Sequence, residues 1–538
     1  MDATMMDFPL TLPAVLEHAG RIHGEAEIVS RLPDRSLHRE SVADFRKRAR
    51  ALAEALMRLG LRRGERVATL MWNHYAHVEA YFGVPSAGGV THTLNLRLHP
   101  DDIAYIVGHA GDRFLIVDDV LLPLYEKFRA KTSFERVFVV PLSGKPVPAP
   151  YESYEDLLAS ATGDFAYPAL DEREPCGMCY TSGTTGRPKG VVYSHRSTVL
   201  HSFCIATPNV FALGRRMTVM PVVPMFHVNA WGLPYASIMT GSRLVMPGPF
   251  LDPESLCDLF AREQVTLAAG VPSLWIGVLD LLTRERAKYK TAPGLRMLIG
   301  GSACPEAMIE GFDKLGIKVE HAWGMTETSP VGTTGALMPR AAEGDSSTEY
   351  LFRAKQGLPL PFVEARAIDD QGEVAWDGKS VGELQVRGPW IAAAYYRPEG
   401  RPQSWTADGW FRTGDVVTID PAGYIKLTDR TKDLIKSGGE WIGSVELENA
   451  LMGHPAVREA AVIAVAHEKW GERPLACVVL KEGARASADE LKAHLAERFA
   501  RWWVPDAVEF VAEIPKTSTG KFQKSRLREL YKDYRLAG

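Results

Sequence analysis

One stretch of the chain, Tyr180–Val191, has the composition of a loop that holds phosphate groups. It packs three glycines, four aliphatic hydroxyl residues and a lysine into twelve positions (YTSGTTGRPKGV). Glycines let backbone amides turn inward around a phosphate, hydroxyl groups add donors or metal ligands, and the lysine supplies positive charge. Strand-like residues flank the stretch at Cys176–Tyr180 and Val191–Tyr193. The sequence therefore predicts a phosphate-binding loop between two strands.

The spacing within this loop excludes the Walker A motif of motor proteins and GTPases. That motif requires G-x-x-x-x-G-K-[ST], whereas Gly186 is followed by Arg-Pro-Lys. Gly378-Lys379-Ser380 has the right ending, but Glu373 stands where the first glycine should be. A different class of phosphate-binding protein is therefore expected.

Two cysteines with CxxC spacing, Cys176 and Cys179, lie just before the loop. A zinc site needs two more ligands at comparable spacing, and the other four cysteines stand alone in the sequence. We therefore interpret the pair as small apolar residues on a buried strand.

The composition of the whole chain sets its general class. Its 538 residues, 46% of them hydrophobic and 24% charged, are too many for one ordinary domain. A formal net charge of −4 argues against a nucleic-acid partner, because phosphate neutralisation needs clustered Lys and Arg. No apolar run approaches the ~18–20 residues of a membrane-spanning helix. Acids stand in Met1–Leu10 where a signal peptide needs bases, and scattered cysteines are typical of reduced thiols. We expect a soluble cytoplasmic protein without a transmembrane segment.

The elements that must position the loop follow an alternating pattern in the first half of the chain. A capping box at Ser41–Asp44 precedes leucines at helical spacing. Strand and helix patterns then alternate, which predicts parallel α/β layers. The expected elements are a strand at Arg66–Trp72, a helix at Tyr75–Ser86, a second helix at His99–Gly111 and a strand at Phe114–Asp118.

The last third of the chain follows other patterns. Short β-like runs separated by Gly and Pro occupy Ser380–Trp390 and Asp415–Asp429. A small α+β module follows, with its boundary expected near Asp429–Asp433. Its predicted elements are strands at Ala460–Val465 and Leu475–Leu480 and a helix capped by Ser487 and Glu490 that continues through Phe499.

Six further motifs, in order along nearly the whole chain, carry a resemblance to a known superfamily. The chain resembles the adenylating enzymes that include acyl-CoA synthetases, peptide-synthetase adenylation domains and firefly luciferase. Its HVNAWG and DRTKDLIKSGGEW segments are most like those of bacterial fatty-acyl-CoA synthetases and 3-(methylthio)propionyl-CoA ligases. The motifs are Pro224–Gly232, Gly300–Pro305, Trp323–Thr328, Gly409–Asp415, Asp429–Trp441 and Pro515–Lys521.

The resemblance implies an α/β fold and an AMP-forming acid:CoA ligase. Residues 1–431 would form a large adenylate-forming domain of layered α/β subdomains plus a β-rich subdomain. Residues 432–538 would form a small mobile α+β domain carrying Lys436 and Lys521. The substrates would be ATP, coenzyme A and an aliphatic acid, expected to be a medium- or long-chain fatty acid. Acyl-AMP would be the intermediate, AMP and pyrophosphate would be released, and Mg²⁺ would assist. A homodimer is the implied assembly.

The resemblance also assigns catalytic roles. Lys521 would bridge the acyl carboxylate and the α-phosphate, where negative charge must be screened as two anions meet. Lys436 would support the same step, and His227 would act as a switch beside the acyl carboxylate. Lys432 would be the hinge about which the small domain turns between two poses, because a hinge is a few residues that absorb a large backbone change.

Further residues are implied to bind ligands. Glu327 and the Thr181 hydroxyl would hold Mg²⁺, which prefers hard oxygen ligands. Asp415 and Arg430 would bind the ribose, and Trp323 would stack on the adenine. The full nucleotide-binding set is Thr181, Ser182, Gly183, Thr184, Thr185, Lys189, Gly301, Ser302, Ala303, His321, Ala322, Trp323, Gly324, Met325, Thr326, Asp415, Arg430, Lys432, Lys436 and Trp441.

The acyl and thiol sites complete the set implied by the resemblance. Trp231 matches a tryptophan that gates the acyl tunnel, and Ala322 stands where relatives often have glycine, so a slightly narrower pocket is expected. Gly438 and Gly439 would help form the passage for the CoA thiol. The acyl-binding set is His227, Val228, Trp231, Ala322 and Pro330.

Several alternatives stay open at this point. The acid could be 3-(methylthio)propionate or another short acid, and the acceptor could be the thiol of a carrier protein. The His227–Leu233 segment has no Asp to pair with a substrate ammonium, which disfavours amino acids. A non-catalytic nucleotide-binding scaffold is disfavoured because Lys521 and Glu327 are both present. Nothing in the sequence favours luciferase-type oxidation.

Overall fold

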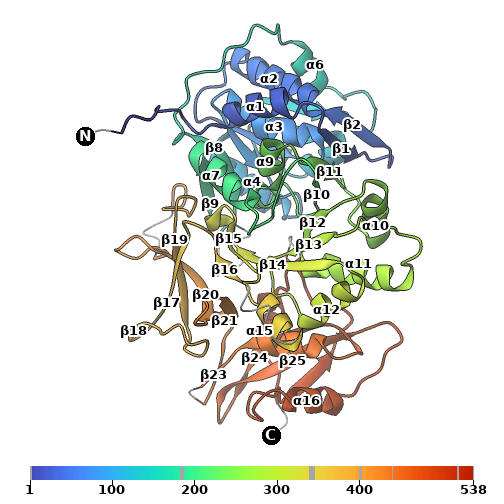
Figure 1. The fold of residues 1–538 in the computed structure, drawn as a ribbon, viewed down its shortest axis with the longest axis vertical. Coiled ribbons are helices and arrows are strands. Elements are labelled where there is room, and N and C mark those ends of the chain that lie inside the picture. Colours follow the sequence, from blue (N-terminus) through green and yellow to red (C-terminus); the bar gives the residue numbers. More distant parts are fainter. Residues whose placement is uncertain are drawn as a thin grey trace.

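A computed structural model describes residues 3–181, 187–338, 346–398, 403–438, 440–517 and 520–536. These residues form four β-sheets (Figure 1). The first sheet has seven strands, and every pairing in it is parallel except β8–β9. The phosphate loop connects these two strands, so it is the turn of an antiparallel hairpin. In spatial order the strands are β7 (Glu152–Ser153), β6 (Arg136–Val140), β5 (Asp112–Asp118), β3 (Arg66–Leu70), β4 (Val90–Thr93), β8 (Pro175–Tyr180) and β9 (Gly190–Ser194).

The second sheet has nine strands with a parallel centre. Strands β14 to β1 pair in parallel in the order given below, and antiparallel strands extend both edges. The order is β16 (Leu358–Pro359), β15 (Val331–Thr334), β14 (Lys318–Gly324), β13 (Arg296–Ile299), β12 (Leu267–Gly270), β10 (Thr218–Pro221), β11 (Arg243–Met246), β1 (Glu27–Arg31) and β2 (Leu37–Ser41).

Helices fill the space between these two sheets and cover their other faces. One large core joins residues of both sheets to α1 (Leu12–Ile22), α3 (Tyr75–Ser86), α7 (His195–Ala206) and α9 (Leu233–Thr240). Every residue of α3 from Ala76 to Ser86 is buried, as expected for a helix enclosed on all sides. The other faces carry α2 (Val42–Arg58), α4 (Pro100–Ala110), α5 (Leu122–Tyr125), α6 (Tyr154–Ala159), α10 (Pro253–Arg262), α11 (Pro272–Arg284), α12 (Glu306–Lys314) and α14 (Ser346–Arg353).

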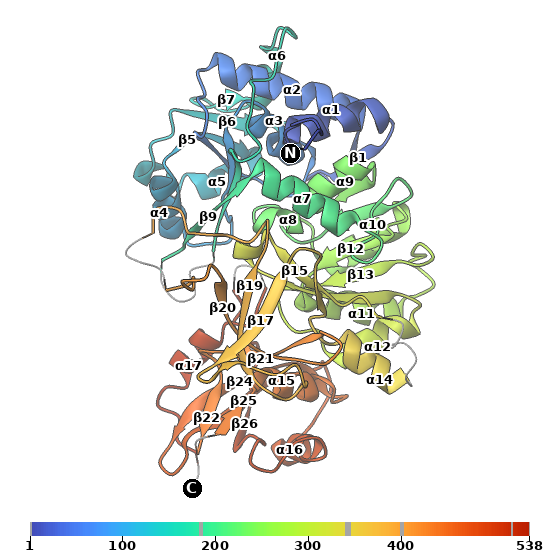
Figure 2. The same cartoon turned by 60° about the vertical axis from the view of Figure 1, so that its left-hand side comes forward.

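A third, antiparallel sheet lies between this large body and the small C-terminal domain (Figure 2). Its strands are β18 (Gly372–Glu373), β17 (Glu364–Asp369), β19 (Gly382–Arg387), β20 (Phe411–Ile419) and β21 (Ile425–Arg430). The small domain has its own sheet and two cores, one on each face. Its elements are β22 (Ile435–Ser437), β23 (Glu440–Ile442), α15 (Ser444–Met452), β24 (Val457–His467), β25 (Gly471–Leu480), α16 (Ala488–Ala496), β26 (Ala507–Phe510) and α17 (Lys524–Leu530).

The elements expected from the sequence are present, with two local corrections. The α/β class, the helix at Tyr75–Ser86 and the four strands named above are confirmed, and Cys176 and Cys179 are buried on β8. The helix capped by Ser487 ends at Ala496 and does not reach Phe499. At the start of α2, the Asp44 carboxylate accepts a hydrogen bond from the Ser41 hydroxyl and not from the cap amide. Within the described residues, no helix has both the length and the apolar character needed to cross a membrane.

A buried ion pair joins α2 to α3 beneath the first sheet. Glu79 is fully buried, and Arg48 Nε donates to its Oε1 at 2.5 Å while the Tyr154 hydroxyl donates to its Oε2 at 2.7 Å. Burial raises the pKa of Glu79, and Arg48 and Tyr154 oppose that rise. Arg48 therefore compensates a charge that water cannot reach.

Replacing Arg48 by Met should destabilise the protein by about 3–5 kcal/mol, because it leaves a buried carboxylate without its cation. Urea denaturation followed by circular dichroism measures the change in the free energy of unfolding. Lys47→Met is the matched control, since Lys47 is the preceding residue of α2 and its pair with Asp44 is exposed. It should change stability by no more than about 0.5 kcal/mol. Equal effects of the two substitutions would contradict this role for Arg48.

Candidate functional site

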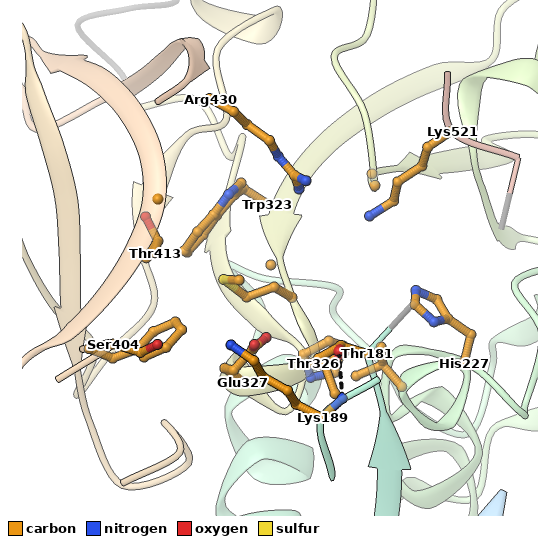
Figure 3. Close-up of a pocket in the computed structure, with 18 of the residues that line it drawn as sticks. Thr181, Lys189, His227, Trp323, Thr326, Glu327, Ser404, Thr413, Arg430 and Lys521 are labelled. Carbon is orange, nitrogen blue, oxygen red and sulfur yellow. Dashed lines mark hydrogen bonds between the residues drawn. The ribbon is translucent and has the colours of Figure 1, made fainter. Parts of the chain in front are cut away.

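A cavity of about 570 Å³ lies where the large body, the third sheet and the small domain meet. Its walls come from the ends of β8 and β14, from β20 and β21, and from the hairpin that precedes α17. Figure 3 shows Lys521 and Arg430 pointing into this space from one side and Glu327, Lys189 and His227 from the other. Residues from sequence positions 181 to 521 thus share one cavity.

The two ends of the phosphate loop form one wall of the cavity. Thr181 N donates to Lys189 O at 2.9 Å, and Lys189 N donates to Thr181 Oγ1 at 3.1 Å. The Lys189 ammonium lies 4.8 Å from the centre of the Tyr395 ring. Both Thr181 and Lys189 line the cavity, as the sequence predicts. Four other predicted loop residues, Ser182, Gly183, Thr184 and Thr185, lie outside the described residues.

Glu327 lies beside this loop in the short 3₁₀ turn Thr326–Thr328. It is only 4% exposed, and the Tyr395 hydroxyl donates to its Oε1 at 2.6 Å. Burial raises the pKa of Glu327, while Tyr395, Lys189 and Arg430 oppose the rise. A buried acid of this kind is stabilised in its ionised form by a nearby cation. Glu327 and Thr181 line one cavity and offer hard oxygen atoms, so they fit Mg²⁺.

Asp415 connects the third sheet to Trp323 at the end of β14. The Trp323 Nε1–H donates to Asp415 Oδ2 at 2.8 Å, and Arg430 Nε lies 3.3 Å from Oδ1. Asp415 and Arg430 are directly opposite each other in the β20–β21 pairing. The sequence predicted all three residues at the site, but it did not predict that the indole N–H would donate a hydrogen bond to one of the carboxylate oxygens.

A second cavity of about 210 Å³ adjoins the first and is lined by four more of the predicted nucleotide residues. Gly301 has a φ of +84°, a left-handed conformation that side chains rarely adopt. Because this position has no side chain, the segment leaves room for Lys521 and Val271 beside it. The residues shared by the two cavities include Gly301, Ala322, Trp323, Gly324, Met325, Arg430, Lys432 and Lys521, and those only in the second include Ser302, Ala303, His321 and Asp415.

Lys521 reaches both cavities from a tight hairpin of the small domain. Thr517 N donates to Lys521 O at 2.7 Å, and Lys521 N donates to Thr517 Oγ1 at 3.1 Å. A methyl group on Gly301 would lie 3.2 Å from Lys521 Cε, and one on Gly520 would lie 3.0 Å from Ser273 Oγ. The absence of side chains at these two glycines lets the hairpin approach the large body closely. The pKa of Lys521 is lowered to about 8, mainly by burial and in part by Arg430, while Asp415 and Glu327 act in the opposite direction.

His227 and Trp231 line the opposite end of the first cavity. Burial, with a smaller effect of Lys521, lowers the pKa of His227 to about 3, so its imidazole is neutral at physiological pH. The next four residues, α8 (Val228–Trp231), have φ angles of +45°, +52°, +49° and +58° and so form a left-handed turn. Left-handed geometry costs roughly 1–2 kcal/mol per residue. The Cys179 thiol donates to Asn229 Oδ1 at 3.4 Å and so ties this turn to the end of β8.

The left-handed turn places Trp231 across the apolar end of the cavity. A methyl group on Gly300 would lie 3.0 Å from Cη2 of Trp231, so the indole packs directly on that glycine. All of the residues predicted to bind the acyl group line this cavity, namely His227, Val228, Trp231, Ala322 and Pro330.

The structure does not bring every predicted residue to the cavities. Three of them lie outside both cavity linings: Lys436 on β22, Gly438 in the turn after it, and Trp441 on β23. Lys436 Nζ lies 5.4 Å from the Trp441 ring centre. The Trp441 side chain is 51% exposed. Gly439 lies outside the described residues. In this arrangement the small domain thus presents Lys521 to the large body and turns its β22–β23 hairpin away.

The cavity also contains residues that sequence reasoning missed. Tyr395 contacts both Glu327 and Lys189, and Ser404 and Phe411 line the same wall. The only available signal was local, because Tyr395 lies within an aromatic pair, Tyr395-Tyr396, outside the recognised motifs.

Comparison with known proteins identifies the family. The model for the AMP-binding enzyme matches residues 16–396, and that for the AMP-binding enzyme C-terminal domain matches residues 446–521. The chain therefore belongs to the AMP-binding enzyme family, the adenylating superfamily that the motifs indicated. Within it, the chain is an AMP-forming acyl-CoA synthetase, an enzyme that uses ATP to join a carboxylic acid to CoA.

Two curated relatives match over almost the whole length. A long-chain-fatty-acid–CoA ligase of Thermus thermophilus is 48% identical over 535 residues, covering 99% of this chain and 97% of that protein. A 3-methylmercaptopropionyl-CoA ligase of Ruegeria pomeroyi is 46% identical over 536 residues, covering 98% of each. Among solved structures, the anthranilate CoA ligase AuaEII in complex with anthranoyl-AMP has a TM-score of 0.86 at 24% identity, with 99% of each chain covered. This last likeness concerns the fold alone.

The electrostatic coupling between Lys521 and Arg430 is directly measurable. We expect Arg430→Ala to raise the pKa of Lys521 above its value of about 8, because removing a nearby positive charge favours the protonated amine. Competitive acetylation as a function of pH, read by mass spectrometry, reports the titration of this single lysine. Arg412→Ala is the control, since Arg412 lines the same cavity but is bound to Glu383. An unchanged Lys521 titration in Arg430→Ala would contradict the arrangement.

Proposed function

We propose that this acyl-CoA synthetase activates an aliphatic fatty acid of medium or long chain, with Lys521 as the catalytic residue of the first half-reaction. The observation that carries the proposal is the burial of the Lys521 ammonium in the cavity that also holds Arg430 and Glu327. The high identity to the long-chain-fatty-acid–CoA ligase supports the choice of acid.

In the first half-reaction the acid carboxylate attacks the α-phosphorus of ATP. A bond forms between a carboxylate oxygen and phosphorus, the bond to the β-phosphate oxygen breaks, and pyrophosphate leaves with the electron pair. Two anions approach each other, so positive charge at the meeting point lowers the barrier. Lys521 in its protonated form supplies that charge. His227, which is neutral, lies at the acyl end, where a second positive charge is not required.

The nucleotide is held by the residues around the two cavities. Asp415 and Arg430 would bind the ribose hydroxyls, and the thin segment Gly301–Ala303 together with His321 and Trp323 would enclose the adenine. Thr181 and Glu327 would hold Mg²⁺, whose chemistry is to neutralise charge on the ATP phosphates. The Tyr395 hydroxyl orients the Glu327 carboxylate toward that task.

In the second half-reaction the CoA thiol attacks the acyl carbon and AMP leaves. We propose that the small domain, residues 432–538, turns about Lys432 relative to residues 1–431 between the two steps. Gly438 and Gly439 would then form the thiol passage. Lys436, expected from the sequence to support acyl-AMP formation, lies outside both cavities while Lys521 lines them, so we propose that it approaches the nucleotide only in this second pose, together with Trp441. The exposure of Trp441 supports this, because an indole on the surface is available for a second contact. A homodimer and a cytoplasmic location stay predictions.

Lys521→Ala should abolish acyl-AMP formation and largely spare conversion of supplied acyl-AMP to acyl-CoA. The first step loses its cation, whereas the second step does not use it. Pyrophosphate release measures the first step, and thioester yield from synthetic acyl-AMP and CoA measures the second. Lys516→Ala is the matched control, because Lys516 lies on the same hairpin but pairs with Glu459. An equal fall in both half-reactions would refute the proposal that Lys521 acts only in acyl-AMP formation.

A second candidate substrate is a short acid such as 3-(methylthio)propionate. The position of Trp231 favours it, since the indole packs on Gly300 and closes the apolar end of the cavity. The methyl group of Ala322, which lines the same cavity, narrows this end in comparison with a glycine. The identity of 46% to the 3-methylmercaptopropionyl-CoA ligase is nearly as high as that to the fatty-acid enzyme.

Trp231→Ala should shift the chain-length profile toward longer acids, by about tenfold in kcat/KM for a long relative to a short acid. The indole closes the end of the cavity into which a long acyl chain would extend. A CoA-dependent AMP-release screen over aliphatic acids of increasing length, with 3-(methylthio)propionate and an aryl acid included, measures it. The KM for ATP should stay within about twofold, and Trp231→Phe should shift the profile less. An unchanged profile would make Trp231 a packing residue only.

Thioester formation on a carrier protein in place of free CoA would favour the carrier-protein thiol as the acceptor.

A further inference from the structure

A buried polar network crosses from the third sheet to the small domain beside the Lys521 hairpin. It begins at Asp429, the last residue but one of β21, which is 1% exposed. Ser444 N donates to Asp429 Oδ2 at 2.7 Å, and Ser444 Oγ donates to the same oxygen at 2.5 Å. The N-cap of α15 is Gly443, which provides no side-chain hydrogen bond. The Asp429 carboxylate therefore caps a helix of the small domain from outside it, where a negative charge is favoured by the helix dipole.

The network continues from Ser444 to the helix that follows the catalytic lysine. Lys524 Nζ donates to Ser444 Oγ at 2.5 Å and lies 2.7 Å from Glu448 Oε1. Glu448 Oε1 also accepts from Val462 N at 2.7 Å, which ties the pair to strand β24. Lys524 is the first residue of α17 and stands three positions after Lys521. The position of the Lys521 hairpin is thus connected, through two side chains, to a carboxylate on β21.

The members of the network divide unequally between the two domains. Asp429 precedes Lys432, whereas Ser444, Glu448 and Lys524 all follow it. If the small domain turns about Lys432, these three residues move together and keep their contacts with one another. Within this network, only the two hydrogen bonds to Asp429 cross the boundary, so they are the part of it that depends on the arrangement that puts Lys521 in the cavity.

We propose that Asp429 and Ser444 form a pose-specific lock that holds the small domain in the arrangement required for acyl-AMP formation. Lys524, bound to Ser444 and Glu448, transmits this placement to the Lys521 hairpin. All three are positioning residues that act through Lys521. The inference rests on the proposed function, because it requires Lys521 to act in the first half-reaction and to leave before the second.

An exposed ion pair across the same boundary provides an internal comparison. Lys426 on β21 pairs with Glu446 on α15, so it joins the same two elements as Asp429 and Ser444. The Lys426 side chain is 46% exposed, and an exposed pair contributes little because water competes with it. The buried link is therefore expected to dominate.

The test measures both half-reactions in Asp429→Asn and Ser444→Ala, using the full-length enzyme. Each should slow acyl-AMP formation by about tenfold to a hundredfold, the range for losing a hydrogen bond to a charged group. Conversion of supplied acyl-AMP with CoA should stay within about twofold or become faster. Lys426→Met is the control and should leave both half-reactions within about twofold. Lys524→Met should slow the first step, and Lys524→Arg, which keeps the charge, should restore most of it.

A double substitution separates the lock from the proposed function. In the Lys521→Ala background, Asp429→Asn should leave conversion of supplied acyl-AMP with CoA within about twofold or make it faster, because the lock opposes the second pose and the lysine is not used there. An equal fall of both half-reactions in both Asp429→Asn and Ser444→Ala would overturn the lock. So would unchanged rates in both variants. If Lys521→Ala itself failed to separate the half-reactions, the proposed function would fail first, whatever the lock variants do.

Discussion

The burial of one ammonium group, that of Lys521, is the constraint on which the rest of the site depends. Moving a charged amine out of water is unfavourable, and here it lowers the pKa to about 8. Two carboxylates, Asp415 and Glu327, partly compensate, while Arg430 opposes them. Gly301 and Gly520 lack side chains where the hairpin lies against the large body, and a methyl group at either position would crowd Lys521 or Ser273. A positive charge placed in this way is available to anions that enter the cavity.

Because this charge belongs to the small domain, its use depends on how the two domains are held together. The Asp429 carboxylate contributes to this, since it caps α15 by accepting a hydrogen bond from Ser444, whose hydroxyl also binds Lys524. The same section of chain continues directly into Arg430 and Lys432, which line the cavities. The proposed nucleotide contact, the proposed hinge and the domain contact therefore occupy four consecutive residues. A movement at the proposed hinge would alter all three together.

The opposite end of the cavity is built on a conformation that is unfavourable by itself. Four residues from Val228 to Trp231 adopt left-handed geometry, which ordinary side chains avoid. The surrounding core stabilises it, since the turn is buried and Asn229 is bound to the Cys179 thiol. Cys179 directly precedes Tyr180 on the strand that leads into the phosphate loop. The wall of the acyl end and the base of the phosphate loop are consequently in contact, although fifty residues separate them in sequence.

The sequence by itself determined the family and the reaction and named many of the residues that line the two cavities, because these depend on local composition and on the order of motifs. The phosphate loop between two strands, the motif glycines and Lys521 could all be named from residue types at fixed spacing. The alternation of strand and helix patterns likewise predicted α3, and short apolar runs predicted the strands of the small domain. The ends of elements were not determined in this way, as the early end of α16 shows, because helix ends depend on contacts outside the segment.

Tertiary structure alone decided which side chains bond to one another across elements. The Asp415 carboxylate binds Trp323, Tyr395 binds Glu327, and Asp429 caps a helix of another domain. Each of these contacts joins residues from different elements, and no periodicity or motif encodes a distance between elements that meet only after folding.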